Sequence, residues 1–280
     1  MRVLFCGVRG STPAPGFAFA RYGGNTSCVA ISHDGDMDPT LILDAGTGLS
    51  RLGRELEGRA FTGSIVVGHL HWDHTHGIPF FAGGDHSDAR VDLYMPEQGD
   101  AKEVLARVMS PPHFPVRPDD LIGKWTFHGL EPGTHRIEGF DVVAREIPHT
   151  GGRTFGYRIS DGRAVIAYLS DHAPISIGQG PRGHGEFHEA ALELARDADL
   201  LIHDAQYTTT EFASRSHYGH STIDYAIELG VRAGVTKVVL FHHDPSRTDD
   251  QLDAVVEVNQ HHQVRVIAAT EGMALALRGR

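Results

Sequence analysis

The sequence predicts an α/β fold in which helices cover the outer faces of β-sheets. Short apolar runs bounded by glycine, aspartate or proline recur along the 280 residues, as expected for strands. These runs dominate the first half of the chain, whereas runs and helical patterns alternate in the second half. This order is typical of a layered sandwich of sheets and helices.

The expected elements follow from the spacing of apolar residues. The expected strands are residues 3–5, 28–31, 41–43, 65–67, 91–94, 141–147, 155–159, 164–169, 200–202, 235–241 and 264–267. The expected helices are residues 48–56, 101–109, 186–196, 221–233 and 249–259. Thr248 and Gln251, three residues apart, predict a capping box at the start of the last helix.

The bulk composition limits the classes of function. The formal charge is -11, with 36 acidic and 25 basic residues, which argues against a large nucleic-acid interface. No apolar stretch approaches the roughly 20 residues of a membrane span, so no membrane association is expected. The first apolar run is too short for a signal peptide, which predicts a cytoplasmic protein. In that reducing compartment, Cys6 and Cys28 are expected to be buried thiols.

The segment after the run at residues 65–67 carries the strongest functional signal. It reads HLHWDH and holds His69, His71, Asp73 and His74. Alternating positions of an extended chain point the same way, so His69 and His71 can bind one cation together. Asp73 and His74, where the strand ends, can turn toward a second cation. Two divalent cations side by side can hydrolyse phosphoesters or acyl bonds, so the motif predicts a dinuclear metal site.

Further candidate ligands follow other predicted strands. They are His149, Asp171 and either His242 or His243. A carboxylate such as Asp171 can bridge two cations, while neutral imidazoles complete each ligand set. Imidazole and carboxylate together suit Zn²⁺, and also manganese or iron. Asp44, at the end of another predicted strand, is expected to orient a liganding histidine.

The order of these motifs resembles the metallo-β-lactamase superfamily along the full length of the chain. After a Gly-rich N-terminal strand pair come LDAGTG at residues 43–48, the HLHWDH segment, a lone histidine, a lone aspartate and a final histidine. The resemblance implies one domain over residues 1–280 with a four-layer αββα sandwich. It implies two metal ions bridged by Asp171, one held by His69, His71 and His149, and the other by Asp73, His74 and His242, with His243 as the alternative to His242.

Three segments resemble the phosphodiesterase branch of that superfamily, which includes RNase Z and bacterial cyclic-phosphate diesterases. They are residues 23–28 (GGNTSC), 198–205 (ADLLIHDA) and 218–222 (YGHST). The second departs from the branch because Asp204 stands where glutamate is more usual. The resemblance implies that His220 assists the leaving group and that Asp204 keeps its imidazole protonated and oriented.

The expected reaction is attack on phosphorus by a hydroxide that bridges the two cations. His220 would then protonate the departing oxygen, while Asp73 would bind metal and also accept the proton of the bridging water. Asn25, Ser27 and Arg153 are candidate contacts to substrate phosphate or sugar. Asn and Ser near turns also commonly bond the backbone, so a structural role is the alternative for both.

The substrate is expected to be a small phosphodiester, such as a cyclic nucleotide. RNase Z proteins carry a tRNA-binding arm between the lone histidine and the bridging aspartate. Here His149 and Asp171 are only 22 positions apart, and two predicted strands fill the interval. Together with the acidic composition, this spacing argues against tRNA as the substrate.

The sequence leaves other functions open. They are a tRNA 3′-processing nuclease, a lactonase or thioesterase, and a non-catalytic module that senses a ligand. The 218–222 turn and Asp204 argue against an acyl hydrolase, and the intact ligand motifs argue against a dead site. The segment 109–118, with four prolines, is either a lid or a plain connector. A homodimer is also left open.

Overall fold

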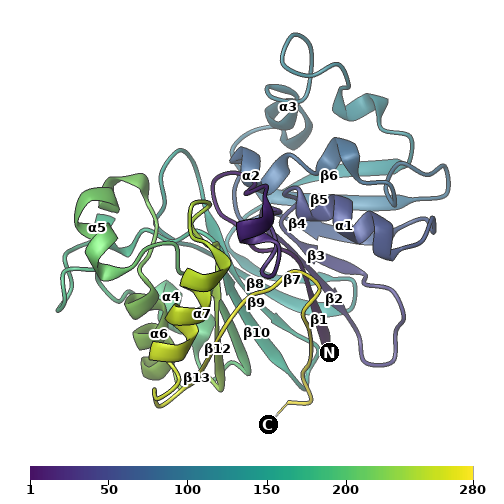
Figure 1. Ribbon diagram of the computed structural model, residues 1–280. Helices are drawn as coiled ribbons and strands as arrows, with labels where there is room; N and C mark the ends of the chain where they lie inside the picture. Colours follow the sequence, from purple (N-terminus) through teal and green to yellow (C-terminus); the bar gives the residue numbers. More distant parts are fainter. Residues whose placement is uncertain (280) are drawn as a thin grey trace.

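Two seven-stranded sheets form the centre of the computed structural model, which describes residues 1–279 (Figure 1). The first sheet contains, in spatial order, β14 (Ala274–Ala276), β1 (Arg2–Gly7), β2 (Cys28–Ser32), β3 (Leu41–Leu43), β4 (Thr62–Val66), β5 (Arg90–Pro96) and β6 (Lys124–Leu130). The second contains β13 (Arg265–Ala268), β12 (Lys237–Phe241), β11 (Leu200–Asp204), β10 (Val165–Leu169), β9 (Phe155–Ser160), β8 (Phe140–Glu146) and β7 (Gly133–Ile137).

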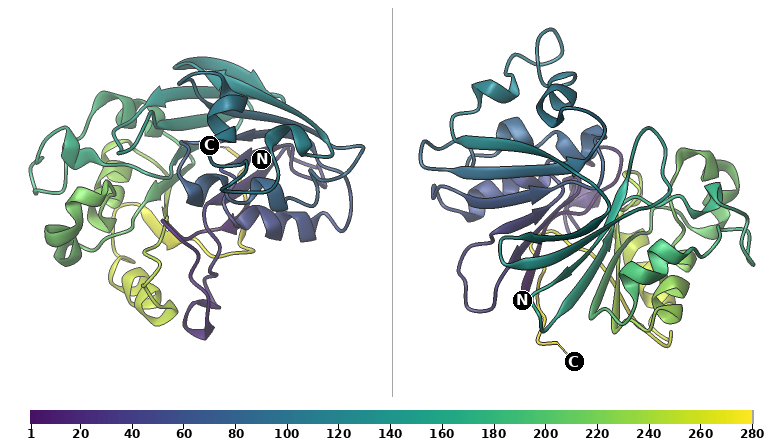
Figure 2. Two further views of the ribbon diagram at one scale, coloured as in Figure 1. Left: turned by 90° about the horizontal axis from the view of Figure 1, so that it is seen from above. Right: turned by 180° about the vertical axis from the view of Figure 1, so that it is seen from behind.

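Helices cover the outer faces of both sheets (Figure 2). The α-helices are α1 (Gly48–Glu55), α2 (Trp72–Thr75), α3 (Ala101–Ala106), α4 (Glu189–Ala195), α5 (Thr209–Arg215), α6 (Ile223–Arg232) and α7 (Asp249–Val258). A short 3-10 helix, η2 (Ile78–Phe80), follows α2. Contacts place α1 on the first sheet and α4, α6 and α7 on the second. None of the described helices is long and apolar enough to span a membrane.

Alternation along the strands builds separate apolar cores on the two faces of each sheet. On β1, Val3 and Phe5 belong to the core between the sheets, whereas Leu4 and Cys6 face the core on the helix-covered side. A third core lies between the second sheet and its helices. Cys6 and Cys28 are both free and buried, as expected. The predicted αββα sandwich is therefore confirmed.

Most predicted elements are present, with ends that shift by a few residues. Thr248 caps α7, and Gln251 completes the capping box as predicted. The prediction missed three strands, β6, β7 and β14, and two short helices, α2 and α5. All three missed strands are edge strands of their sheets. Edge strands are partly exposed and therefore mix polar with apolar residues, which weakens the sequence signal.

Parallel pairing brings the functional motifs to common sheet edges. β3, β4, β5 and β6 run parallel, as do β10, β11, β12 and β13. The carboxyl ends of parallel strands lie at the same edge, where binding residues of open α/β sheets gather. The segments after β4 and β10 and the ends of β11 and β12 therefore converge at the site described below.

A buried arginine ties the N-terminal segment to the C-terminal part of the second sheet. The side chain of Arg9 is fully buried. Its Nε donates to the carbonyl oxygen of Gly23 at 2.8 Å, and its Nη1 donates to those of Arg247 at 2.7 Å and Asp244 at 3.2 Å. The carboxylate of Asp249, at the start of α7, lies 3.7 Å from Nη2. One side chain thus satisfies three carbonyl groups that the fold removes from water.

Arg9→Met should destabilise the protein by about 3 kcal/mol, because it leaves three buried carbonyl groups without a donor. Urea unfolding measures this loss. Arg21→Met is the matched control: Arg21 also faces α7, where it pairs with Asp250 and Asp253, but its side chain is about half exposed. The control should leave the unfolding midpoint nearly unchanged. Equal midpoints for both variants would contradict the anchoring role of Arg9.

Candidate metal centre

The HLHWDH segment changes conformation within its own length. The backbone is extended at His71 and then enters α2, a single helical turn where a loop was expected. Asp73 and His74 lie on the buried side of this turn, whereas Trp72 points outward with 63% of its surface exposed. The turn thus separates the direction of His71 from that of Asp73 and His74, as two neighbouring cation sites require.

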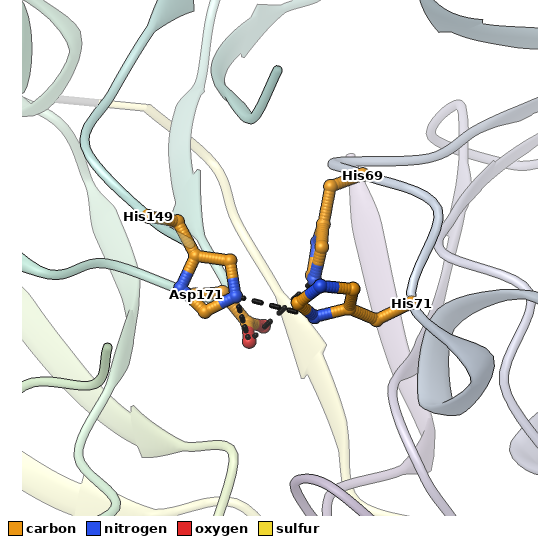
Figure 3. Close-up of side chains that lie close together, drawn as sticks. All are labelled: His69, His71, His149 and Asp171. Carbon is orange, nitrogen blue, oxygen red and sulfur yellow. Dashed lines mark hydrogen bonds and ion pairs between the residues drawn. The ribbon is translucent and has the colours of Figure 1, made fainter. Parts of the chain in front are cut away.

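Two groups of side chains able to bind a metal ion share Asp171. Within each group, the candidate ligand atoms lie within 4.8 Å of one another. The first group consists of His69, His71, His149 and Asp171. The second group consists of Asp73, His74, His242 and Asp171. In Figure 3, His69 and His71 approach from one side, while His149 and Asp171 approach from the other.

The donor atoms of these groups fit bound cations. Both ring nitrogens of His69, Nε2 of His74 and Oδ1 of Asp171 are buried and form no hydrogen bond. Nε2 of His74 lies only 2.9 Å from Oδ1 of Asp171, yet the two atoms are not hydrogen-bonded to each other. Buried polar atoms rarely lack partners. Cations held within the two groups would satisfy Nε2 of His74, Oδ1 of Asp171 and one ring nitrogen of His69.

The charge balance also favours cations. Asp44, Asp73, Asp171 and Asp204 are all buried in this region. Among residues 1–279, their ion pairs are with histidines, and no lysine or arginine pairs with any of them. Burying carboxylates is unfavourable unless positive charge compensates them. Two divalent cations would provide that charge.

The protonation of the histidines is consistent with metal binding. Burial lowers the pKa of His69, His71 and His149, so these rings are neutral, which is the form that binds metal. Burial also acts on His74, but the surrounding carboxylates, first among them Asp44, raise its pKa well above the usual value. Metal binding at His74 would therefore release a proton.

Asp44 orients His74 from behind, which is the kind of contact expected from the sequence. Its Oδ2 accepts hydrogen bonds from Nδ1 of His74 at 2.7 Å and from the hydroxyl of Tyr168 at 2.6 Å. Its Oδ1 accepts from the backbone N–H of Gly68 at 2.7 Å. The bond from Nδ1 of His74 leaves its Nε2 facing the carboxylates of Asp73 and Asp171. Asp44 has a φ of 59°, an uncommon conformation that its three bonds stabilise.

His220 and Asp204 form a pair beside both groups. Nδ1 of His220 lies 3.2 Å from Oδ2 of Asp204 and 3.6 Å from Oδ2 of Asp171. Backbone N–H groups of His172 and Ser221 also donate to Oδ2 of Asp204, each at 3.1 Å, and fix the carboxylate. Burial lowers the pKa of His220, but the nearby carboxylates, first Asp204, outweigh it and raise the pKa to about 9. The ring is therefore protonated on both nitrogens, as an imidazolium, at neutral pH.

Only one of the two adjacent histidines after β12 belongs to the ligand groups that share Asp171. Nε2 of His242 is 3.1 Å from Oδ2 of Asp73, and its Nδ1 bonds the side-chain oxygen of Gln206 at 2.9 Å. His243 turns away and donates from Nε2 to the carbonyl oxygen of Ala269 at 2.9 Å. The geometry thus assigns His242 to the second group.

Two residues that bond the candidate ligands could not be predicted from the sequence. Gln206 orients His242, and Ser11 donates its backbone N–H to Oδ2 of Asp73 at 2.7 Å. The side chains of Gln206 and Ser11 also bond each other at 3.2 Å. Both lie outside the motifs, and a backbone donor leaves no mark on residue type. Sequence reasoning had no means of finding them.

Two of the three candidate substrate contacts, Asn25 and Arg153, are bound to other residues. The side chain of Asn25 donates to Glu271 at 3.0 Å, and Ser27 is fully buried. Arg153 borders a small cavity beside His71, but its guanidinium donates to Glu146 and to a second carboxylate, that of Glu131. Asn25 and Arg153 therefore have no free donor for a substrate, whereas the hydroxyl of Ser27 has no hydrogen-bond partner but is closed off from solvent.

Comparison with known proteins identifies similar chains. Over 322 aligned residues, which include 99% of this chain and 98% of the relative, 28% are identical to a Ribonuclease Z of Methanosarcina acetivorans. The structure is similar to that of the human tRNase Z short form, with a TM-score of 0.69, 21% identity and 99% of each chain covered. It is also similar to a diphosphatase from the PhnP family, with a TM-score of 0.72, 18% identity and coverage of 99% and 97%.

The family model described as the beta-lactamase superfamily domain matches residues 40–243. This range includes every candidate metal ligand described above. The solved structures share the arrangement of two sheets flanked by helices. The chain therefore belongs to the metallo-β-lactamase superfamily.

Proposed function

We propose that the protein is a dinuclear metal-dependent phosphodiesterase that hydrolyses a small phosphodiester. The observation that carries this proposal is the His220–Asp204 pair beside two ligand groups that share Asp171. Alkoxide leaving groups of phosphodiesters are strongly basic and need a proton as they depart. A buried imidazole with a pKa of about 9 retains such a proton at neutral pH.

The protein residues divide the remaining tasks. Bound Zn²⁺, or Mn²⁺ or iron in its place, would supply Lewis acidity and lower the pKa of a coordinated water. Asp73, whose Oδ2 accepts the backbone N–H of Ser11, would hold metal and would also serve as the base that accepts a proton from the attacking water. His220 donates a proton to the leaving oxygen. Asp204 acts as a positioning residue, since it holds His220 without reaching the reacting atoms.

Two observations support a small substrate. The interval between His149 and Asp171 is filled by β9, β10 and the short turn that joins them, so it leaves no length for an arm. The net charge of -11 gives little general attraction to a polyanion. The diphosphatase of the PhnP family, similar in fold, is consistent with phosphate chemistry on this scaffold.

A tRNA-processing nuclease is the second candidate. It is favoured by the relatives named Ribonuclease Z, which this chain matches over nearly its whole length. The chemistry at the metal centre would be the same, since both substrates are phosphodiesters. The two candidates differ in what surrounds the scissile bond, and kinetics on the two substrate classes separates them.

Metal-replete protein should contain about two metal equivalents per chain, because two complete ligand groups share one carboxylate. Elemental analysis of purified protein measures this content. His71→Ala should lose metal and activity together, whereas His220→Ala should keep its metal. Each Asp171 group has four ligands without His220, which belongs to a separate candidate group with Asp204 and His242. One equivalent or fewer in the unmodified protein would refute the dinuclear assignment.

His220→Ala should slow substrates with poor alkoxide leaving groups by roughly 10²–10⁴-fold, the usual contribution of general acid catalysis. Bis-p-nitrophenyl phosphate should lose much less, since p-nitrophenolate departs with little protonation. Asp204→Asn should give the same dependence on the leaving group, more weakly. Equal losses for both substrate types at unchanged metal content would instead mean that His220 binds phosphate or supports the fold.

Precursor tRNA should be cleaved far more slowly than a small phosphodiester, because the chain has no arm between His149 and Asp171 to hold it. The measurement compares kcat/KM for 3′ processing of a precursor tRNA with that for 2′,3′-cyclic AMP. Salt-sensitive, efficient tRNA cleavage at low enzyme concentration would favour the nuclease candidate.

A further inference from the structure

A large apolar cavity lies next to the candidate metal centre. Its volume is about 580 Å³, within the usual range for small-molecule sites. It lies between α2 and η2 on one side and, on the other, α3, which is labelled near the top of Figure 1, with the loop after it. Its main apolar and aromatic walls are Trp72, His76, Phe80, Leu105, Met109 and Phe114.

The cavity is lined by aromatic rings that are only partly covered by their neighbours. Trp72 and His76 are stacked, with ring centroids 5.7 Å apart and planes inclined by 12°. Phe80 and Phe114 meet edge to face, with centroids 5.7 Å apart. Trp72 and Phe80 are each 63% exposed, a large exposure for side chains of this size. Such a wall is suited to a flat ring, which can stack on the indole.

The cavity adjoins the metal centre through Trp72 and Arg107. Trp72 lies between His71 and Asp73 in the chain, so the helical turn that carries ligands also forms a cavity wall. Arg107 borders this cavity and a second one of about 200 Å³, which is lined by His69 and His71. A ligand that bridges the two cavities would therefore pass Arg107 before it reaches the metal centre.

Arg107 has donors to offer to an anion. It is exposed, and within residues 1–279 its guanidinium forms no hydrogen bond or ion pair. Arg153, which borders the smaller cavity as well, is held by Glu131 and Glu146. A free guanidinium can bind phosphate oxygens with two parallel hydrogen bonds. Arg107, not Arg153, is thus the arginine available for a substrate phosphate.

We propose that this cavity binds the base of a nucleotide, while Arg107 contacts the phosphate on its way to the metal centre. The inference rests on the proposed function and narrows its substrate to mononucleotide phosphodiesters, such as cyclic nucleotides. An aliphatic acyl chain would also fit apolar walls. A stacked aromatic wall beside an unpaired arginine, however, complements a flat ring joined to an anion. Residues 109–118, which contribute Met109 and Phe114, then form part of the substrate site.

Tryptophan fluorescence tests base binding without any need for hydrolysis. The chain has two tryptophans, so Trp125→Phe leaves Trp72 as the reporter. Adenosine 5′-monophosphate should quench zinc-loaded protein in a saturable manner, whereas ribose 5-phosphate should not. Trp72→Phe in the otherwise unmodified chain should abolish the quenching, which covers the case in which Trp125→Phe folds poorly. Because binding and turnover are read separately, an inactive protein that still binds the nucleotide would count only against the proposed function.

Variants of the wall and of the arginine separate the two contacts. Phe114→Ala should weaken both adenosine 5′-monophosphate and adenosine by about tenfold, the effect of removing one aromatic contact. Arg107→Gln should weaken only the monophosphate, also by about tenfold. Arg54→Gln should change neither, since Arg54 is an exposed arginine that borders neither cavity.

Two results would overturn the inference. One is equal binding of adenosine 5′-monophosphate and ribose 5-phosphate, which would assign all affinity to the phosphate. The other is quenching of Trp72 by decanoate but not by the nucleotide, which would assign the cavity to an acyl chain. Absence of any nucleotide-dependent quenching in protein with a full metal content would equally refute base binding.

Discussion

The carboxylate of Asp44 joins the two sheets at the point where the candidate metal ligands meet. Asp44 follows β3 of the first sheet, yet it accepts a hydrogen bond from Tyr168 on β10 of the second. The same carboxylate fixes the ring of His74. Asp171 follows β10, so its distance from the histidines of the first sheet depends on how the sheets are held together. The buried core between the sheets and the Asp44 bonds hold them.

The two halves of the molecule supply different parts of the site. The first half contributes the HLHWDH segment and the aromatic cavity, and the second contributes the shared carboxylate and the His220–Asp204 pair. α2 connects these tasks, because its buried side carries Asp73 and His74 while Trp72 faces the cavity. A change in this single turn would therefore disturb both the metal centre and the cavity proposed to bind the base of a nucleotide.

Much of the fold could be predicted because burial leaves a strong mark on sequence. Strands buried on both faces, such as β3 and β11, are continuous apolar runs and were found. The edge strands β6 and β7 were missed, since their exposed or partly exposed positions carry lysine, histidine, threonine and arginine. The helix α2 was missed because four residues are too few to show a helical period.

The sequence by itself determined a layered α/β sandwich and the residue types of the candidate centre, because strand periodicity and the spacing of HLHWDH are local properties of the sequence. The αββα order of the layers was implied by the resemblance to the metallo-β-lactamase superfamily. Only the tertiary structure decided between His242 and His243. The direction of each ring depends on its hydrogen-bond partner, Gln206 or Ala269, and both partners lie far from these histidines in the sequence. The tertiary structure also distinguished Arg107 from Arg153. Whether an arginine is free depends on which carboxylates the fold brings beside it, and no local pattern encodes that.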